Sequence, residues 1–141
     1  MARIHIEFPE PPLFSTTLAV YQSHINQAGH VDNALLLTLV SEARARFFSF
    51  IELPEVDRNG LGIVLADTAV QYLSEAFHGE ELRIDVAVAD FNKYGCDLLY
   101  RIREVKSGRD VARVKNGIVF FDYVKRAIHP LPEAFRQRTA A

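Results

Sequence analysis

The sequence predicts a single α+β domain over residues 1–141, in which a five-stranded antiparallel sheet wraps around one long central helix. Two patterns lead to this fold class. Residues 34–51 repeat their apolar side chains with the spacing of a helix, whereas the chain after them alternates apolar and polar residues with a period of two. Hydrophobic residues make up 49% of the chain, which is typical of a globular domain with one core.

The first strand is predicted over residues 13–21, which read LFSTTLAVY and are rich in β-branched and aromatic residues. Residues 1–12 before it end in a proline-rich run and are expected to form an N-terminal extension. The long helix follows over residues 34–51. Asp32 and Asn33 stand at its N-cap position, and Pro54 ends it.

Four strands are predicted after the helix, because apolar residues alternate with polar ones and short turns separate the segments. Successive strands joined by short turns pair in an antiparallel sheet, and the helix is the only element that can cover its inner face. A polar tail is expected from about residue 132 to residue 141. The four strands cover residues 62–73, 82–88, 98–103 and 111–123.

A sheet of this kind leaves a long edge strand without a neighbour, and a second copy of the chain would pair with it. The sequence therefore predicts a homodimer or a homotetramer. A monomer kept soluble by its surface charges is the alternative.

Charge and hydropathy exclude several classes of protein. The formal net charge of −2 lacks the basic excess of a nucleic-acid binder. A membrane-spanning helix needs about 20 mostly apolar residues, and the chain has no such run. The first residues also lack the basic stretch and apolar core of a signal peptide, so a cytoplasmic location is expected.

Cysteine and histidine give no sign of a metal site or a disulfide. Cys96 is the single cysteine, and a lone cysteine is more often a small buried hydrophobe than a nucleophile. The five histidines are scattered without the close spacing of metal ligands. No metal is expected.

The loop of residues 23–33 gathers polar side chains just before the helix. The first N–H groups of a helix lack intrahelical partners and lie at the positive end of its dipole, so they can bind an anion or a developing oxyanion. Gly29 allows a ligand to approach the backbone closely. The alternative is an ordinary capping loop in which Asp32 or Asn33 caps the helix.

These residues resemble the 4-hydroxybenzoyl-CoA thioesterase family of hotdog-fold proteins over nearly the whole chain. The family motif runs approximately D-x-D-x-x-G-H-V-N-N, and Gly29, His30, Val31 and Asn33 match it. Further matches follow in the family's order: EAR on the helix (42–44), QYL leading to GE (71–73 and 79–80), DVA (110–112), and FD leading to PLP (121–122 and 130–132).

The resemblance implies hydrolysis of an acyl-CoA thioester, with the pantetheine arm running along a dimer interface and no cofactor besides the coenzyme A of the substrate. The carbonyl would lie at the N-terminus of the helix, with the Gly29 and His30 N–H groups as oxyanion donors. The acyl group, and whether coenzyme A or an acyl carrier protein presents it, stay open.

The chain departs from the family where the catalytic carboxylate is expected, because that aspartate falls on Asn26 and the earlier motif aspartate on His24. A carboxamide cannot act as a general base. Other hotdog branches pair a loop Asn or Gln with a helix carboxylate of the opposing subunit about fifteen residues further along. Glu42 of a partner chain, sixteen residues after Asn26, is therefore the candidate base, with Asn26 orienting the water or the carbonyl. Alternatively Glu42 pairs with Arg46, its i+4 neighbour.

Other residues have secondary roles in this interpretation. His24 is a second candidate base, because imidazole titrates near neutral pH. Asp32 is expected to cap the helix. Glu75 and His78 could line the substrate entrance, but a solvated turn is the simpler expectation. The resemblance implies binding of the nucleotide end of coenzyme A by Lys93, Lys125 and Arg126, which could instead be solubilising residues.

Two other functions remain open from the sequence. Asn26 favours an acyl-CoA or small-acid binding protein that keeps the pocket without turnover. A lyase or dehydratase acting on an acyl-CoA would need a base at His24 or His30.

Overall fold

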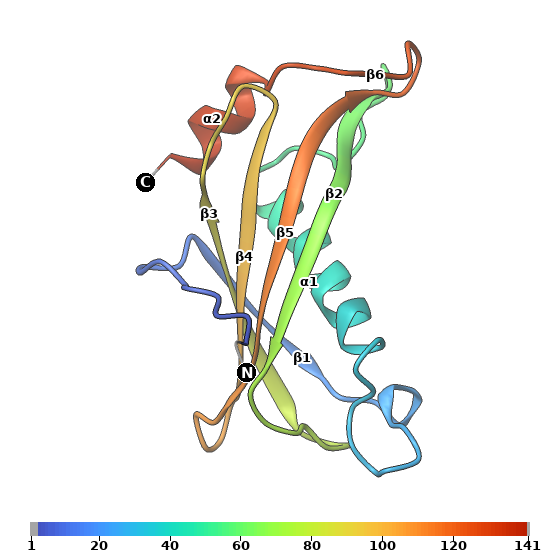
Figure 1. Cartoon of the computed structure of the whole chain (residues 1–141), viewed down its shortest axis with the longest axis vertical. Helices are drawn as coiled ribbons and strands as arrows, with labels where there is room; N and C mark the ends of the chain where they lie inside the picture. Colours follow the sequence, from blue (N-terminus) through green and yellow to red (C-terminus); the bar gives the residue numbers. More distant parts are fainter. Residues whose placement is uncertain (1–2, 141) are drawn as a thin grey trace.

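The regular elements follow the predicted order of one strand, one long helix and then four strands, as the computed structural model shows for residues 3–140 (Figure 1). Three short elements add to that order. They are a 3-10 turn before the helix, a two-residue strand, and a C-terminal helix. The elements are β1 (Phe14–Ala19), η1 (Gln22–His24), α1 (Leu36–Phe50), β2 (Leu61–Tyr72), β3 (Glu81–Ala89), β4 (Gly95–Glu104), β5 (Asp110–Asp122), β6 (Ala127–Ile128) and α2 (Glu133–Thr139).

The strands form one antiparallel sheet in the order β1-β3-β4-β5-β2, and β6 adds a short sixth strand against β5. The sheet curves along α1, which lies against its inner face (Figure 1). The predicted α+β class, with an antiparallel sheet around one long helix, is confirmed. Strand β6 was not predicted, because two residues are too few for a periodic pattern.

The core lies between α1 and the inner face of the sheet. The apolar face of α1 is buried, and Ala43 and Phe47 on it have no exposed surface. The small side chain of Ala43 lets the helix backbone approach the sheet closely. From the sheet, alternate residues of β3, β4 and β5 complete the core, among them Ile84, Val86, Leu98, Tyr100, Ile102 and Val114.

The N-terminal extension lies along the outer face of the sheet. Ile6 and Phe8 are buried in a second, smaller cluster with Ala87 and Leu99. The backbone of Ile6 is tied to the sheet, since its carbonyl accepts a hydrogen bond from Arg113 Nη1 at 3.3 Å. This segment therefore covers part of a face that the alternation pattern alone would leave to solvent.

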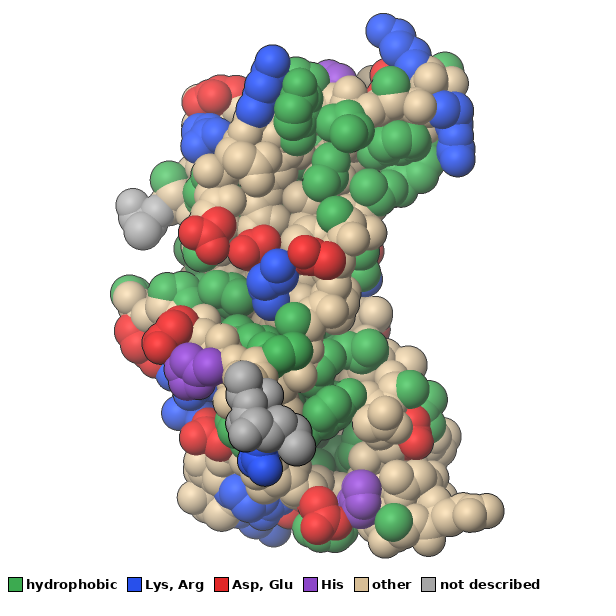
Figure 2. Space-filling model, viewed as in Figure 1, with side chains coloured by type: hydrophobic (Ala, Val, Ile, Leu, Met, Phe, Trp, Pro, Cys, Tyr) green, Lys and Arg blue, Asp and Glu red, His purple; other side chains and the backbone are tan. Residues whose placement is uncertain are grey.

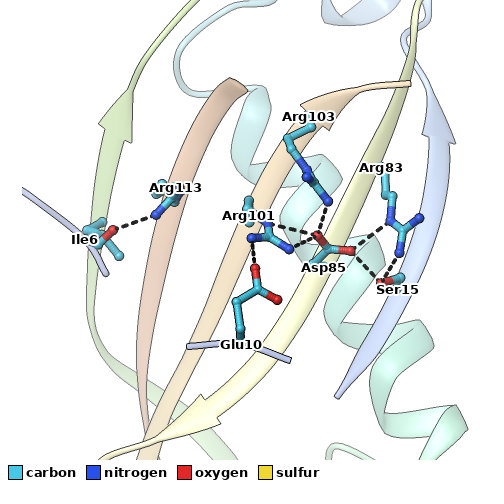
Figure 3. Close-up of polar contacts among 8 residues, drawn as sticks. All are labelled: Ile6, Glu10, Ser15, Arg83, Asp85, Arg101, Arg103 and Arg113. Atoms are coloured by element: carbon cyan, nitrogen blue, oxygen red, sulfur yellow. Dashed lines mark hydrogen bonds and ion pairs between the residues drawn. The ribbon is translucent and has the colours of Figure 1, made fainter. Parts of the chain in front are cut away.

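Asp85 on β3 is a fully buried carboxylate on the same outer face (Figure 3). Its Oδ1 accepts hydrogen bonds from Ser15 Oγ at 2.5 Å and Arg83 Nε at 2.9 Å. Its Oδ2 accepts from Arg101 Nε at 3.0 Å and Arg103 Nη2 at 2.9 Å. Arg101 also pairs with Glu10, so the cluster joins β1, β3 and β4 to the N-terminal extension.

Acidification is expected to destabilise the fold through Asp85. Burial raises the pKa of its carboxyl, but the hydrogen bonds from Ser15, Arg83 and Arg101 outweigh burial and hold the pKa below its usual value. Ionised Asp85 therefore stabilises the fold above an unfolded-state pKa of about 4, and this contribution is lost as the pH falls through the lower folded-state pKa. Urea unfolding midpoints should stay level from pH 7 to pH 5 and fall below pH 4. An unchanged midpoint down to pH 2 would contradict this assignment.

The segment expected to be a polar C-terminal tail contains helix α2 over residues 133–139. Phe135 has no exposed surface and packs against Phe48 of α1 and Phe120 of β5, with ring centroids 6.0 and 5.1 Å away. One aromatic residue in a short polar segment gives no periodicity to detect. Its partners lie far away in the sequence, so only the folded chain reveals that Phe135 belongs to the core.

Candidate active site

A cavity of about 650 Å³ opens at the N-terminal end of α1. Its walls come from two segments that are far apart in the sequence, the loop leading into α1 and the loop that follows β2. Asn26, His30 and Asn33 line it from the first segment, and Tyr72 and Glu75 line it from the second. The polar loop predicted from the sequence therefore lines a cavity that can hold a ligand.

The loop before α1 is folded by Asn26. Its backbone N–H donates to the His30 carbonyl at 2.9 Å, and its Oδ1 accepts from the Ala28 N–H at 3.0 Å. The Gly29 N–H donates to the Asn26 carbonyl at 3.1 Å, and the φ of +90° at this position favours glycine. Gly29 therefore shapes the turn, and it does not line the cavity.

Asp32 caps the helix, as predicted. Its Oδ2 accepts hydrogen bonds from the N–H groups of Ala34 and Leu35 at 3.0 and 3.1 Å. Tyr72 ties the neighbouring carbonyl of Asn33 to the end of β2 through a hydrogen bond of 2.8 Å from its hydroxyl. Burial, and then the charge of Asp32, raise the pKa of Tyr72, so its hydroxyl remains a donor at neutral pH.

Several backbone N–H groups at the cavity remain available for a ligand, including two from the loop before α1. Among residues 3–140, the N–H groups of His30 and Asn33 find no protein acceptor, and both residues line the cavity. They lie beside the N-terminus of α1, where the helix dipole favours negative charge. Of the two oxyanion donors predicted from the sequence, the His30 N–H is thus free, whereas the Gly29 N–H is engaged in the turn.

The side chain of His30 faces a carboxylate across the cavity wall. Its Nε2 lies 3.6 Å from Glu75 Oε2, and its Nδ1 lies 3.1 Å from the Val31 carbonyl oxygen. The side chains are 30% and 61% exposed. Of the two places expected for Glu75, the substrate entrance and a solvated turn, the structure shows it on the cavity wall with a largely exposed side chain. No local pattern could reveal a contact between residues 45 positions apart.

Glu42 lies outside the cavity of its own chain. Its Oε2 accepts a hydrogen bond from Arg46 Nε at 2.8 Å, which is the ion pair considered as the alternative. Arg46 in turn donates to Thr16 Oγ1 at 2.9 Å. The Glu42 side chain is 51% exposed, so within one chain it is solvated rather than surrounded by apolar residues.

His24 is also outside the cavity lining. Its Nδ1 accepts a hydrogen bond from the Tyr21 N–H at 3.0 Å, and the two rings stack with their centroids 5.8 Å apart. The ring therefore holds the short turn after β1, and the structure does not bring it together with Asn26 and His30.

The three basic residues expected to bind coenzyme A lie in turns at the end of the sheet away from the N-terminus of α1 (Figure 1). The Lys93 ammonium lies 5.3 Å from the centroid of the Tyr94 ring. The Arg126 guanidinium lies 5.6 and 5.9 Å from the rings of Phe121 and Tyr123. Lys125 precedes Arg126 in the turn between β5 and β6. Figure 2 shows basic and apolar side chains gathered at this end of the molecule.

Two further features limit the chemistry of the described chain. Cys96 is buried, and burial, followed by the charge of Asp97, raises the pKa of its thiol to about 12. The thiolate form is therefore absent at neutral pH. Within residues 3–140, no cluster of three or more His, Cys, Asp or Glu residues could hold a metal ion.

The sequence of this chain matches a known protein family. The family model described as "thioesterase-like superfamily" matches residues 20–139 of the chain. The chain belongs to this superfamily. The match includes the loop before α1, all the walls of the cavity and the whole of α2. The resemblance found in the sequence is thereby confirmed.

Solved structures of other superfamily members show the same hotdog fold. A 1,4-dihydroxy-2-naphthoyl-CoA thioesterase from Synechocystis superposes with a TM-score of 0.82 at 19% identity, over 89% of this chain and 94% of that one. A putative thioesterase from Pseudomonas aeruginosa superposes with a TM-score of 0.84 at 18% identity, over 92% of this chain and 100% of that one. A Staphylococcus aureus protein in complex with CoA superposes with a TM-score of 0.81 at 18% identity, over 89% of this chain and 80% of that one. No curated protein sequence matches the chain significantly.

At the level of the superfamily, the chain is thus a thioesterase-like hotdog protein. None of the helices in residues 3–140 combines the length and the apolar character that crossing a membrane requires.

Proposed function

We propose that this protein hydrolyses an acyl-CoA thioester in the cavity at the N-terminus of α1. The observation that carries the proposal is that His30 and Asn33, whose N–H groups have no protein acceptor among the described residues, both line the cavity of a chain of the thioesterase-like superfamily. When water attacks a thioester, negative charge develops on the carbonyl oxygen. Two preorganised N–H donors stabilise that charge, and each can be worth about 3 kcal/mol.

A substrate that contains coenzyme A is supported by the Staphylococcus aureus protein, whose structure holds CoA on the same fold. The basic residues Lys93, Lys125 and Arg126 are proposed to bind its phosphates. In one chain they lie at the end of the sheet away from the cavity, so they would serve the cavity of a second copy (Figure 1).

A dimer is part of the proposal. Strand β2 is an edge of the sheet, and Leu65 and Tyr72 on it are exposed. An exposed edge of twelve residues is a ready template for pairing with a second copy. A second copy would also be needed for Glu42 to reach a cavity, because it lies outside the cavity of its own chain.

The alternative function is binding of an acyl-CoA or a small acid without turnover. Asn26 favours it, because an amide lies where relatives would carry the catalytic carboxylate, and its Oδ1 is engaged in the turn. Asn26 can orient a ligand, but it cannot accept a proton from water.

The test is thiol release from a panel of aromatic, short-chain and long-chain acyl-CoAs, with the purified protein beside its Glu42→Gln variant. The aromatic arm includes 1,4-dihydroxy-2-naphthoyl-CoA, the substrate named for the Synechocystis enzyme. We expect turnover by the parent protein on at least one arm. Loss of turnover in the variant would support Glu42 as the base.

Two other outcomes lead to different conclusions. If the variant keeps its turnover, Glu42 is not the base and only forms the ion pair with Arg46. If the folded parent releases no thiol but binds the CoA thioesters in calorimetry, hydrolysis is refuted and the binding function replaces it.

A further inference from the structure

We propose that Glu75 is the carboxylate that activates water in this cavity and that the His30 side chain positions it. The inference rests on the thioester hydrolysis proposed above, and it assigns the base to a residue of the same chain that supplies the oxyanion donors. It addresses the gap left by Asn26, which has no carboxylate to offer.

Glu75 and Asp32 are the two carboxylates that line the cavity. Asp32 is anchored at the entry to α1, because its Oδ2 accepts hydrogen bonds from the N–H groups of Ala34 and Leu35 just before the helix. The Glu75 carboxylate has one polar contact among the described residues, the approach of its Oε2 to His30 Nε2 at 3.6 Å. Its Oε1 is therefore free to accept a hydrogen bond from a water molecule in the cavity.

The backbone around Glu75 is fixed, although its side chain is not. The Glu75 carbonyl accepts a hydrogen bond from Arg109 Nη2 at 2.9 Å. The Val31 N–H donates to the Ala76 carbonyl at 2.8 Å and joins this loop to the loop that carries His30. The loop that carries Glu75 is thus held beside the loop that carries the N–H donors, and both line the same cavity.

His30 faces an acceptor at each ring nitrogen, the Val31 carbonyl at Nδ1 and Glu75 at Nε2. The contact at Nε2 is favourable when that nitrogen carries a proton, because the ring then directs an N–H at the Glu75 carboxylate. The other charged groups here are Asp32, bound to α1, and Arg109, which pairs with Glu80 at 3.0 Å. Neither competes for the Glu75 carboxylate, so His30 directs one of its oxygens and leaves the other for water.

The reaction balances without a further reactant. Glu75 Oε1 takes a proton from water as the water oxygen bonds to the thioester carbon, and the carbonyl oxygen becomes an oxyanion on the His30 and Asn33 N–H groups. The tetrahedral intermediate then collapses, the carbon–sulfur bond breaks, and the thiolate recovers the proton from Glu75. One water and one thioester become one carboxylic acid and one thiol.

The first experiment compares kcat and KM of the parent, Glu75→Gln and Glu81→Gln on the best substrate of the panel. Removal of a general base lowers kcat by about 10²- to 10⁴-fold, and we expect a loss of this size in Glu75→Gln with little change in KM. Glu81 is an exposed carboxylate on β3 outside the cavity, so its variant should match the parent. Thermal melts verify that each variant is folded.

A second experiment separates catalysis from structure. Added formate should restore part of the kcat of Glu75→Ala, because a small carboxylate can occupy the vacated space, and no merely structural role would respond in this way. The double variant Glu75→Gln/His30→Gln tests the role of His30. Its kcat should be no lower than that of Glu75→Gln alone, because a positioning residue acts only through its partner.

Failure of the inference and failure of the proposed function are distinguishable. If the parent hydrolyses a thioester and Glu75→Gln keeps its kcat, Glu75 is not the base and hydrolysis stands. The same conclusion follows if formate has no effect. If the folded parent releases no thiol from the whole panel, hydrolysis is refuted, and the role of Glu75 with it.

Discussion

Replacing Asp85 with asparagine is expected to destabilise the protein by about 3 kcal/mol and to lower its melting temperature by roughly 10 °C. Asp85 is fully buried, and its two carboxylate oxygens accept hydrogen bonds from three arginines and a serine (Figure 3). Removing one partner of a buried ion pair leaves the other charge uncompensated, which typically costs about 3–5 kcal/mol.

The lower end of that range applies because the three arginines differ in exposure. The Arg101 side chain is only 13% exposed, so its charge would be left buried. Arg83 and Arg103 are 51% and 34% exposed and can turn to solvent. Arg101 would also keep its pairing with Glu10.

The matched control is Glu10→Gln, which removes the outer carboxylate from the same arginine. Glu10 is exposed, and an exposed pair contributes at most about 1 kcal/mol. Urea unfolding of the two variants and the parent gives the comparison. A loss in Asp85→Asn no larger than that in Glu10→Gln would show that the cluster is not a stabilising centre of the outer face.

The second large effect is expected from Phe135→Ala, which should destabilise the fold by about 3–5 kcal/mol. The ring has no exposed surface and packs between Phe48 and Phe120. Its removal leaves a void and detaches α2 from the rest of the core. Because the cavity at the N-terminus of α1 does not include Phe135, ligand binding by the folded fraction should be unchanged.

Gln137→Ala is the control for this change, since Gln137 lies on the same helix and is exposed. Its effect should stay within about 0.5 kcal/mol. Equal stability of the two variants in thermal melts would mean that α2 contributes nothing to the fold.

The elements that the sequence predicted share a strong local signal. The long helix was predicted over residues 34–51, and α1 covers Leu36–Phe50, because its apolar residues recur at helical spacing. The alternating strands were likewise predicted close to their observed ends. Helix α2 and strand β6 were not predicted. Short elements have too few residues for a periodic pattern, and they form through contacts with distant parts of the chain.

The site was predicted only in part, because only one of its walls lies in a segment with a strong local signal. The polar loop before a long helix and the GHVDN motif located one wall of the cavity, and the cap formed by Asp32 follows from its place in the sequence. The other wall comes from the loop after β2. Its position depends on the pairing of β2 with β5, which no local pattern specifies.

The sequence by itself determined the fold class, the long helix, the superfamily and the location of the polar loop, because each depends on a pattern of residues close together in the sequence. The tertiary structure decided which side chains meet. It placed Glu75 beside His30 and joined the loop after β2 to the loop before α1 through the hydrogen bond from the Val31 N–H to the Ala76 carbonyl. It also buried Asp85 among arginines of two neighbouring strands. Most of these contacts depend on register and loop geometry, which are set by packing of the whole chain.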